Sequence, residues 1–212
     1  MYNGLVRSRR FIITLVLFIY AFIGASESAR AESSLMAKGS VGFTEPQVRN
    51  WKSEYTGQLS YGAGLTYELQ LGKVVGIEIG AEYFTRKFIE LSSGAVMELK
   101  SVRVPVQFKG HLNRWMSLGG GVFADYTLGD ISYNSGPVSL FSYGISPWNY
   151  GWIADFTTQM WLGATSAVYL QGRYFQGVRN LSDLGGISEF KYRDYQLSLG
   201  FQLVLAGKGL SR

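Results

Sequence analysis

Nine charged side chains lie between apolar residues along the chain. They are the residues of this sequence whose types and spacing could support proton or ion transfer. They are Lys38, Glu68, Glu78, Glu82, Arg103, Lys109, Asp125, Asp155 and Arg173. Glu78 and Glu82 share one face of a predicted strand, and Arg103 and Lys109 share the matching face of the next strand. Such a set suits a proton or ion relay, or a structural plug of paired charges, and we favour the plug.

Residues for catalysis or metal binding are scarce. The chain has no cysteine and a single histidine, His111, whereas hydrolytic and metal sites usually recruit these side chains. His111 falls in a predicted short turn, where we expect a solvated residue. The glycines at 119–121 lie inside a predicted strand, so they are not a phosphate-binding loop. We therefore expect no enzyme, no catalytic residue, no metal and no cofactor.

The elements that carry these charges are strands in which apolar and polar residues alternate. In one of them Leu65, Tyr67 and Leu69 alternate with Thr66 and Glu68, which is the period of two that a strand requires. Beyond residue 31 no helical period appears. Eight strands are predicted, at 35–43, 57–71, 74–84, 101–110, 116–128, 152–163, 167–177 and 194–206.

The seven connections between these strands alternate in length. The long ones are 44–56, 85–99, 129–151 and 178–193, and the short ones are 72–73, 111–115 and 164–166. Short turns at one end and long loops at the other indicate an up-and-down barrel with both chain termini at the short-turn end.

The composition of the polar face distinguishes a soluble barrel from one that spans a membrane. In the strands at 57–71, 74–84, 116–128 and 194–206 the apolar face carries no charge, while the opposite face is mostly glycine and serine with a few charges of both signs. A narrow eight-stranded interior needs such small and mutually pairing residues. The sequence therefore predicts an all-β protein, an eight-stranded antiparallel up-and-down transmembrane β-barrel. The alternative is a soluble lipocalin-like binder with its apolar face inside.

Aromatic residues gather where strands meet the connections. Candidates for two interfacial belts are Trp51, Tyr83, Trp148 and Trp152 near the long loops, with Trp115 and Trp161 near the short turns. Belts of this kind mark the two surfaces of a membrane. Pro105 interrupts one strand, and because proline has no N–H to donate, we expect a local bulge or a missing hydrogen bond there.

The first 31 residues predict an export signal. Arg7, Arg9 and Arg10 precede an apolar run at 11–24, and Ala29-Arg30-Ala31 supplies a cleavage site before Glu32. The run falls short of the roughly 20 residues that span a bilayer. We divide the chain into a cleaved signal peptide, 1–31, and a barrel domain, 32–212. Removing the signal leaves 16 basic and 14 acidic residues, so the charge gives no support to nucleic-acid binding.

Three stretches resemble a known family. SVRVPVQFKGHL (101–112), YLQGRYFQGVRNLSD (169–183) and DYQLSLGFQLVL (194–205) are similar to the PorT-like outer-membrane β-barrel proteins of diderm bacteria, and the resemblance covers about 35–206. It implies a small barrel in the outer membrane, delivered by the barrel insertion machinery. The chain departs from many outer-membrane proteins because it continues past its last strand as AGKGLSR instead of ending on an aromatic residue.

The predicted function is a structural or surface-interaction role in the outer membrane of a diderm bacterium. Both termini would be periplasmic, the barrel would contact lipid and lipopolysaccharide, and a surface partner would bind through 44–56, 129–151 and 178–193, the second of which is rich in Tyr, Ser, Gly and Asn. The alternative is a narrow channel for small or apolar solutes. A lipid-modifying enzyme and a lipocalin-like binder are the weaker readings.

Overall fold

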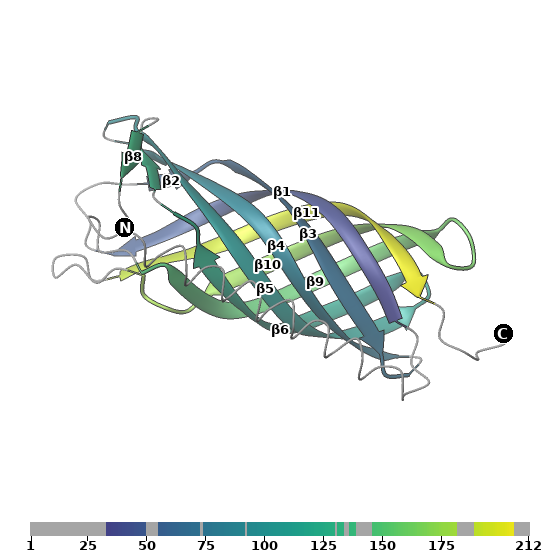
Figure 1. Ribbon diagram of the computed structural model, residues 1–212. Helices are drawn as coiled ribbons and strands as arrows, with labels where there is room; N and C mark the ends of the chain where they lie inside the picture. Colours follow the sequence, from purple (N-terminus) through teal and green to yellow (C-terminus); the bar gives the residue numbers. More distant parts are fainter. Residues whose placement is uncertain are drawn as a thin grey trace, which may run out of the picture.

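Alternating sequences of this kind pair as antiparallel strands, and in the computed structural model eight of them close into a barrel (Figure 1). The structure describes residues 33–49, 55–72, 74–91, 93–129, 131–133, 136–138, 146–181 and 189–205. The predicted signal peptide, residues 1–31, and Trp51 lie outside the described residues, so their roles stay predictions. Within the described part of the chain, no helix is long and apolar enough to cross a membrane.

The barrel ring follows the order of the chain. Its strands are β1 (Ser33–Arg49), β3 (Leu59–Gln70), β4 (Val75–Glu90), β5 (Val96–Asn113), β6 (Met116–Thr127), β9 (Trp148–Trp161), β10 (Ser166–Gly177) and β11 (Glu189–Leu205). The last strand, β11, pairs with β1 along its whole length, which closes the ring. Each predicted strand overlaps one of these eight, so the predicted fold is confirmed.

Three short strands lie outside the ring. β2 (Tyr55–Gly57) pairs with the C-terminal end of β4. β7 (Ile131–Tyr133) and β8 (Gly136–Val138) form a hairpin that continues the sheet beyond β5. These additions belong to the end with the long connections, opposite the short turns (Figure 1). We call this the upper end of the barrel.

The outer face of the barrel is apolar and the inner face is polar. Leu59 and Leu199 are 70% and 63% exposed, whereas Arg103 and Glu78 are 0% and 1% exposed. The exposed apolar side chains share the outward face: Leu35, Val41, Phe43, Leu59, Tyr61, Leu65, Val106, Phe108, Leu118, Val122, Phe156, Leu170, Leu197, Leu199, Phe201 and Leu203. A continuous apolar exterior around a polar interior is the arrangement of a barrel in lipid. The lipocalin-like alternative, with its apolar face inside, is therefore wrong.

The strands extend further toward the upper end than the sequence predicted. The predicted loop at 85–99 is wrong for most of its length, because β4 continues to Glu90 and β5 begins at Val96. The predicted loop at 44–56 is likewise mostly strand, since β1 runs to Arg49 and β2 covers Tyr55–Gly57. The predicted loops at 129–151 and 178–193 are shortened by the starts of β9 and β11.

Apolar and polar faces exchange places in these upper extensions. Phe88, Met97 and Leu99 point inward and are buried, while Lys87 and Lys100 point outward and each form an ion pair with Glu98. Above the bilayer the outer face meets water, so the apolar side chains there turn toward the interior. Because the apolar residues change from the outer to the inner face, a sequence pattern with one continuous apolar face does not predict these strand extensions.

The irregularity predicted at Pro105 is present as a break in pairing. Pairing between β4 and β5 stops after Ile79↔Val106 and resumes at Glu82↔Arg103 in the same register, and no pair joins the residues between them in this described ladder. Pro105 therefore leaves hydrogen bonds unmade without adding a bulge.

Candidate functional site

The interior of the barrel holds two clusters of buried charge. The first, which we call the lower cluster, consists of Lys38, Glu78, Glu82, Lys109, Asp155 and Arg173. Arg173 on β10 pairs with both Glu78 and Glu82 on β4. The Lys109 Nζ atom lies 3.1 Å from Glu78 Oε2 and 3.3 Å from Asp155 Oδ1. Three bases face three acids, so the lower cluster is neutral as a whole.

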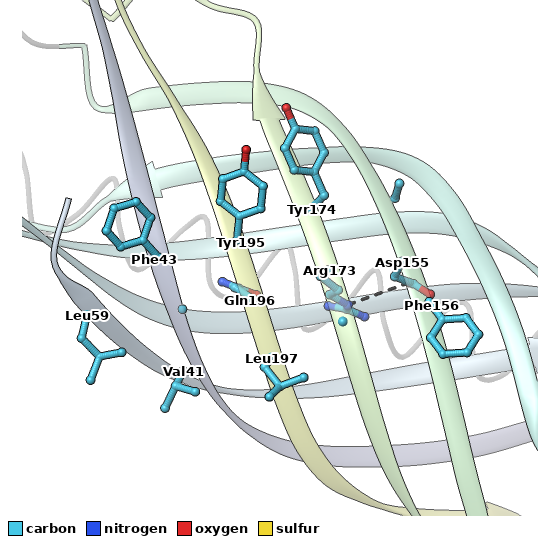
Figure 2. Close-up of a pocket in the computed structure, with 13 residues that line it drawn as sticks. Val41, Phe43, Leu59, Asp155, Phe156, Arg173, Tyr174, Tyr195, Gln196 and Leu197 are labelled. Carbon is cyan, nitrogen blue, oxygen red and sulfur yellow. Dashed lines mark ion pairs between the residues drawn. The ribbon is translucent and has the colours of Figure 1, made fainter. Parts of the chain in front are cut away.

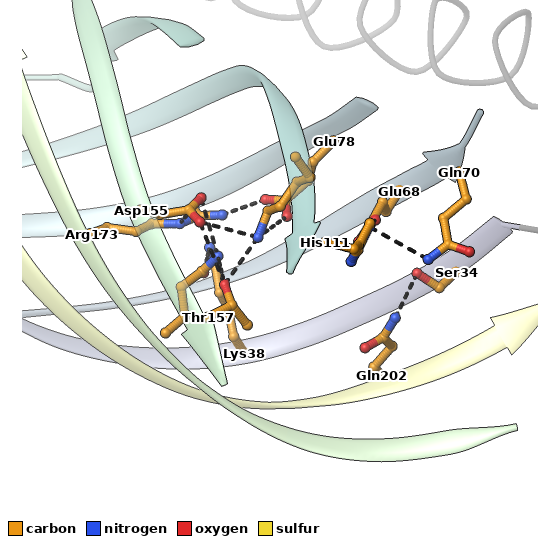
Figure 3. Close-up of polar contacts among 12 residues, drawn as sticks. Ser34, Lys38, Glu68, Gln70, Glu78, His111, Asp155, Thr157, Arg173 and Gln202 are labelled. Atoms are coloured by element: carbon orange, nitrogen blue, oxygen red, sulfur yellow. Dashed lines mark hydrogen bonds and ion pairs between the residues drawn. The ribbon is translucent and has the colours of Figure 1, made fainter. Parts of the chain in front are cut away.

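Neutral side chains complete the hydrogen bonding of the lower cluster (Figure 3). Lys109 Nζ donates to Thr157 Oγ1 at 3.0 Å, and Gln171 Nε2 donates to the same hydroxyl at 3.1 Å. Lys38 Nζ, which pairs with Glu82 at 2.5 Å, also donates to Gln171 Oε1 at 3.3 Å. Buried charges are tolerated when such hydrogen bonds satisfy their remaining donors and acceptors.

The second cluster, the upper cluster, lies closer to the upper end and consists of Arg86, Arg103, Asp125 and Asp194. Arg86 Nη2 lies 2.5 Å from Asp125 Oδ2 and 2.8 Å from Asp194 Oδ2. Arg103 pairs with Asp194 and lies 3.4 Å from Asp125. Two bases therefore share two acids, and this cluster is neutral as well.

Hydroxyl groups and aromatic rings hold the upper cluster in place. Thr44 Oγ1 donates to Asp194 at 2.6 Å, and the Tyr192 hydroxyl donates to Asp125 at 2.7 Å. The Arg103 guanidinium carbon lies 3.8 Å from the centre of the Phe175 ring. A guanidinium over an aromatic face is stabilised by the charge distribution of the ring. Arg103 is therefore fixed by two carboxylates and by aromatic packing.

The two clusters reach across the full width of the lumen. In the ring order β4 and β10 are four positions apart among eight, and so are β5 and β11. Arg173 joins the first pair of opposite strands through Glu78 and Glu82, and Arg103 joins the second through Asp194. Side chains thus span the interior along two crossing diameters, as expected for an eight-stranded barrel whose interior is just wide enough to be filled.

A third contact lies at the short-turn end. His111 Nε2 lies 2.7 Å from Glu68 Oε1, and Gln70 Nε2 lies 3.5 Å from the same ring nitrogen. The prediction that His111 is a solvated turn residue is wrong: β5 continues to Asn113, which turns the His111 side chain toward the interior, where it is 12% exposed.

All nine charged side chains proposed from the sequence are buried in the interior, and Lys38 is a member of the lower cluster. Glu78, Glu82, Lys109, Asp155 and Arg173 join the lower cluster, Arg103 and Asp125 join the upper cluster, and Glu68 contacts His111. The register places Glu82 opposite Arg103, as expected. The ion pairs of Glu82, however, go to Lys38 and Arg173.

Two members of the upper cluster were missed from the sequence. Arg86 falls in the predicted loop at 85–99, and Asp194 begins the predicted strand at 194–206 but is not among the predicted lumen charges. A signal was available for Asp194, because it lies on the same face of its strand as Gln196 and Ser198. Arg86 follows Glu82 by four residues and shares its face in the same way.

The predicted interfacial aromatics that the structure describes lie on the outer face. Tyr83, Trp148 and Trp152 are exposed toward the upper end. At the short-turn end Trp115 is exposed, and Trp161 Nε1 donates to the Arg114 carbonyl oxygen at 2.8 Å. Around the upper end the ring centres of Trp152 and Tyr174 lie 5.1 Å apart, and those of Tyr174 and Tyr195 lie 5.3 Å apart.

Fold, apolar exterior and charged lumen together define a small transmembrane β-barrel of the outer-membrane class. Among solved structures, the chain is similar to outer membrane protein AlkL, with a TM-score of 0.55, 14% identity, and coverage of 86% of this chain and 93% of that one. It is also similar to outer membrane protein OprG from Pseudomonas aeruginosa, with a TM-score of 0.50, 14% identity, and coverage of 82% and 96%. At this identity the likeness shows the fold. A comparison with models of protein families finds no match, and neither does one with curated protein sequences.

Proposed function

We propose that the protein is a closed outer-membrane barrel with a structural or surface-interaction role. The observation that carries this proposal is the pair of crossing ion-pair bridges, Arg173 with Glu78 and Glu82, and Arg103 with Asp194. Each bridge joins opposite walls, and both clusters are neutral. A solute that passed through would have to separate buried, mutually paired charges, and removing one partner from such a pair costs about 3–5 kcal/mol. General diffusion through this lumen is therefore unfavourable.

The upper extensions supply the surface for an interaction. β4 and β5 continue above the aromatic belt, and the β7–β8 hairpin widens their sheet. Their outward face carries Lys87, Glu98 and Lys100 in one group of ion pairs. We propose that this end, with segments 44–56, 129–151 and 178–193, contacts a surface partner. Kinship with the PorT-like barrels and delivery by the insertion machinery also remain proposals.

A narrow channel is the alternative, and one observation favours it. Several buried polar atoms of the described interior have no hydrogen-bond partner, among them both amide atoms of Gln107 and of Gln196 and the Ser198 hydroxyl. Buried groups of this kind normally bond to something, and water is the usual occupant of a polar interior. A hydrated lumen would allow very small solutes to pass between the bridges.

An enzymatic role has less support. His111 lies at the short-turn end in contact with Glu68, away from the upper surface where a lipid-modifying barrel would work. Among the described residues, no group of three or more potential ligands is placed to hold a metal. We accordingly propose a barrel without catalysis, metal or cofactor.

Planar-bilayer recording of the full chain tests the closed barrel. We expect the wild type to show no large steady conductance. Arg173→Ala should produce frequent cation-preferring openings, because it removes the bridge and leaves the lower cluster with two bases, Lys38 and Lys109, against three acids. Arg193→Ala, which changes an outward arginine, should remain silent. Large steady conductance of the wild type would overturn the proposal and favour the channel.

A further inference from the structure

The outer wall of the barrel is hollowed on one side, below the upper aromatic belt. The hollow has a volume of about 630 Å³ and its lining is formed largely by outward apolar residues of β1, β3, β9, β10 and β11. Figure 2 shows Tyr174, Tyr195 and Phe43 along one edge, with Phe156 and Leu197 along the other. Its size falls within the range of sites that hold small apolar ligands.

Gly172 makes the hollow possible. Its register neighbours are Phe156 on β9 and Leu197 on β11, both large and outward. A Cβ atom added to Gly172 would meet no atom within 4 Å. A larger residue would fit there without a clash, so the glycine leaves open a space that the protein itself does not fill.

A set of polar side chains lies at the upper edge of the hollow, and we call it the cap: Tyr174, Gln176, Arg193 and Glu45. The Tyr174 hydroxyl donates to Gln176 Oε1 at 2.8 Å, and Arg193 Nε donates to the same oxygen at 2.8 Å. Arg193 also lies 3.7 Å from Glu45, and both side chains remain substantially exposed, at 38% and 47%. With its amide oxygen turned toward Arg193, Gln47 accepts from Arg193 Nη2 at 2.7 Å. A guanidinium has five donors in a planar fork that matches a phosphate, and these contacts do not use all of them.

The spacing between the cap and the hollow matches the distance between the charged head and the acyl chain of an amphiphile. Arg193, Tyr195 and Leu197 are successive outward residues of β11, which places them about 7 Å apart along the strand. The order along the wall is charge, aromatic ring and apolar hollow. This is also the order of phosphate, glycerol or sugar ester, and acyl chain in a membrane lipid.

We propose that this wall is a binding site for a phosphorylated lipid of the outer leaflet, the lipid A part of lipopolysaccharide. One acyl chain would lie over Gly172, and a phosphate would meet Arg193. The inference rests on the proposed outer-membrane placement and assigns one lipid to one wall of the barrel.

A second hollow on the same barrel provides an internal comparison. It has a volume of about 710 Å³ and is lined by the outward residues Gly39, Ala63 and Ala81 together with larger apolar neighbours. The next outward residues toward the upper end are Val41, Tyr61 and Tyr83. The cation at its upper edge is Lys87, whose Nζ atom lies 5.5 Å from the centre of the Tyr61 ring and 3.4 Å from Glu98 Oε2. The second hollow thus has similar space, but a lysine lacks the planar fork of a guanidinium, so we expect ordinary acyl chains of any lipid to fill it.

Native mass spectrometry of the full chain in detergent tests the site, with diphosphorylated lipid A, its phosphate-free form and phosphatidylglycerol as probes. We expect the wild type to retain one diphosphorylated lipid A. Arg193→Gln, which removes the charge, should weaken retention about tenfold, the effect of losing roughly one charge-assisted contact. Gly172→Leu, which fills the hollow, should also weaken retention about tenfold, the effect of no longer burying roughly two methylene groups of the acyl chain. Gly39→Leu, which fills the second hollow, should leave retention unchanged.

Three results would overturn the inference: equal retention of the phosphate-free lipid, equal retention of phosphatidylglycerol, or equal losses from Gly172→Leu and Gly39→Leu. Each would mean that lipid covers the barrel without a specific site. Folding is monitored separately by the heat-dependent shift in gel mobility of every variant. Loss of that shift in the wild type would refute the proposed barrel, whereas a normal shift with unselective retention would refute the lipid site alone.

Discussion

Arg103 offers the sharpest test of how the lumen is stabilised. Replacing it with methionine, Arg103→Met, keeps an apolar side chain of similar length beside Phe175 but leaves Asp125 and Asp194 to share the single guanidinium of Arg86. The upper cluster changes from two bases and two acids to one base and two acids. Breaking a buried pair by removing one partner costs about 3–5 kcal/mol. We expect the free energy of unfolding to fall by this amount in urea titrations of the vesicle-inserted protein, followed by tryptophan fluorescence.

The matched control restores the charge balance. Arg103→Met combined with Asp125→Asn leaves one base and one acid, and the asparagine oxygen can still accept from Arg86 or Tyr192, which contact Asp125 in the wild type. The double variant should therefore be more stable than the sum of the two single losses, by about 1–3 kcal/mol. Strict additivity would refute the reasoning, because it would mean that each side chain acts by packing and not through the balance of charge.

Further predictions concern the wall and the short-turn end. Gly121→Ala should destabilise the barrel by about 1–3 kcal/mol, since a Cβ there would lie 2.5 Å from the Gln107 Cα atom, whereas the neighbouring outward Gly120→Ala should be nearly neutral in the same urea titration. His111→Ala should cost about 1–3 kcal/mol by leaving the Glu68 carboxylate unpaired, and adding Glu68→Gln should recover part of that loss. Leu199→Arg, on the lipid-facing wall, should cost about 2–4 kcal/mol in vesicles, while Val96→Arg on the upper extension should cost much less; equal losses would contradict the assigned lipid boundary.

The central part of each strand could be predicted from the sequence because lipid imposes a simple rule. Every second residue must be apolar where it meets the bilayer, and stretches such as Leu197, Leu199 and Phe201 on β11 obey this without exception. The rule ends where the bilayer ends. At Lys87 and Phe88 the apolar residue turns inward and the charged one outward, so the upper extensions read as loops.

The site was only partly predictable for a related reason. Alternation tells which side chains face the lumen, but it does not tell at what height along the barrel each one lies. Arg86 and Asp194 are 108 residues apart in the chain, and their contact at 2.8 Å depends on the tilt and stagger of strands on different sides of the ring. Register alone does not settle the pairing either, because Glu82 lies directly opposite Arg103, yet the ion pairs of Glu82 go to Lys38 and Arg173.

The buried ion pairs also fix the register of the strands, which the small residues of the inner face specify only weakly. Much of the inner face is glycine and serine, which fit any pairing of the strands about equally well, and weakly specified strands are prone to slip. A slip of one residue in β10 would turn Arg173 from the lumen to the lipid, where an arginine near the middle of the bilayer costs about 2–4 kcal/mol. The same slip would leave Glu78 and Glu82 without that partner. Because five basic residues on β1, β4, β5 and β10 are held in this way, the two clusters select one register for the whole ring, even if each pair adds little net stability.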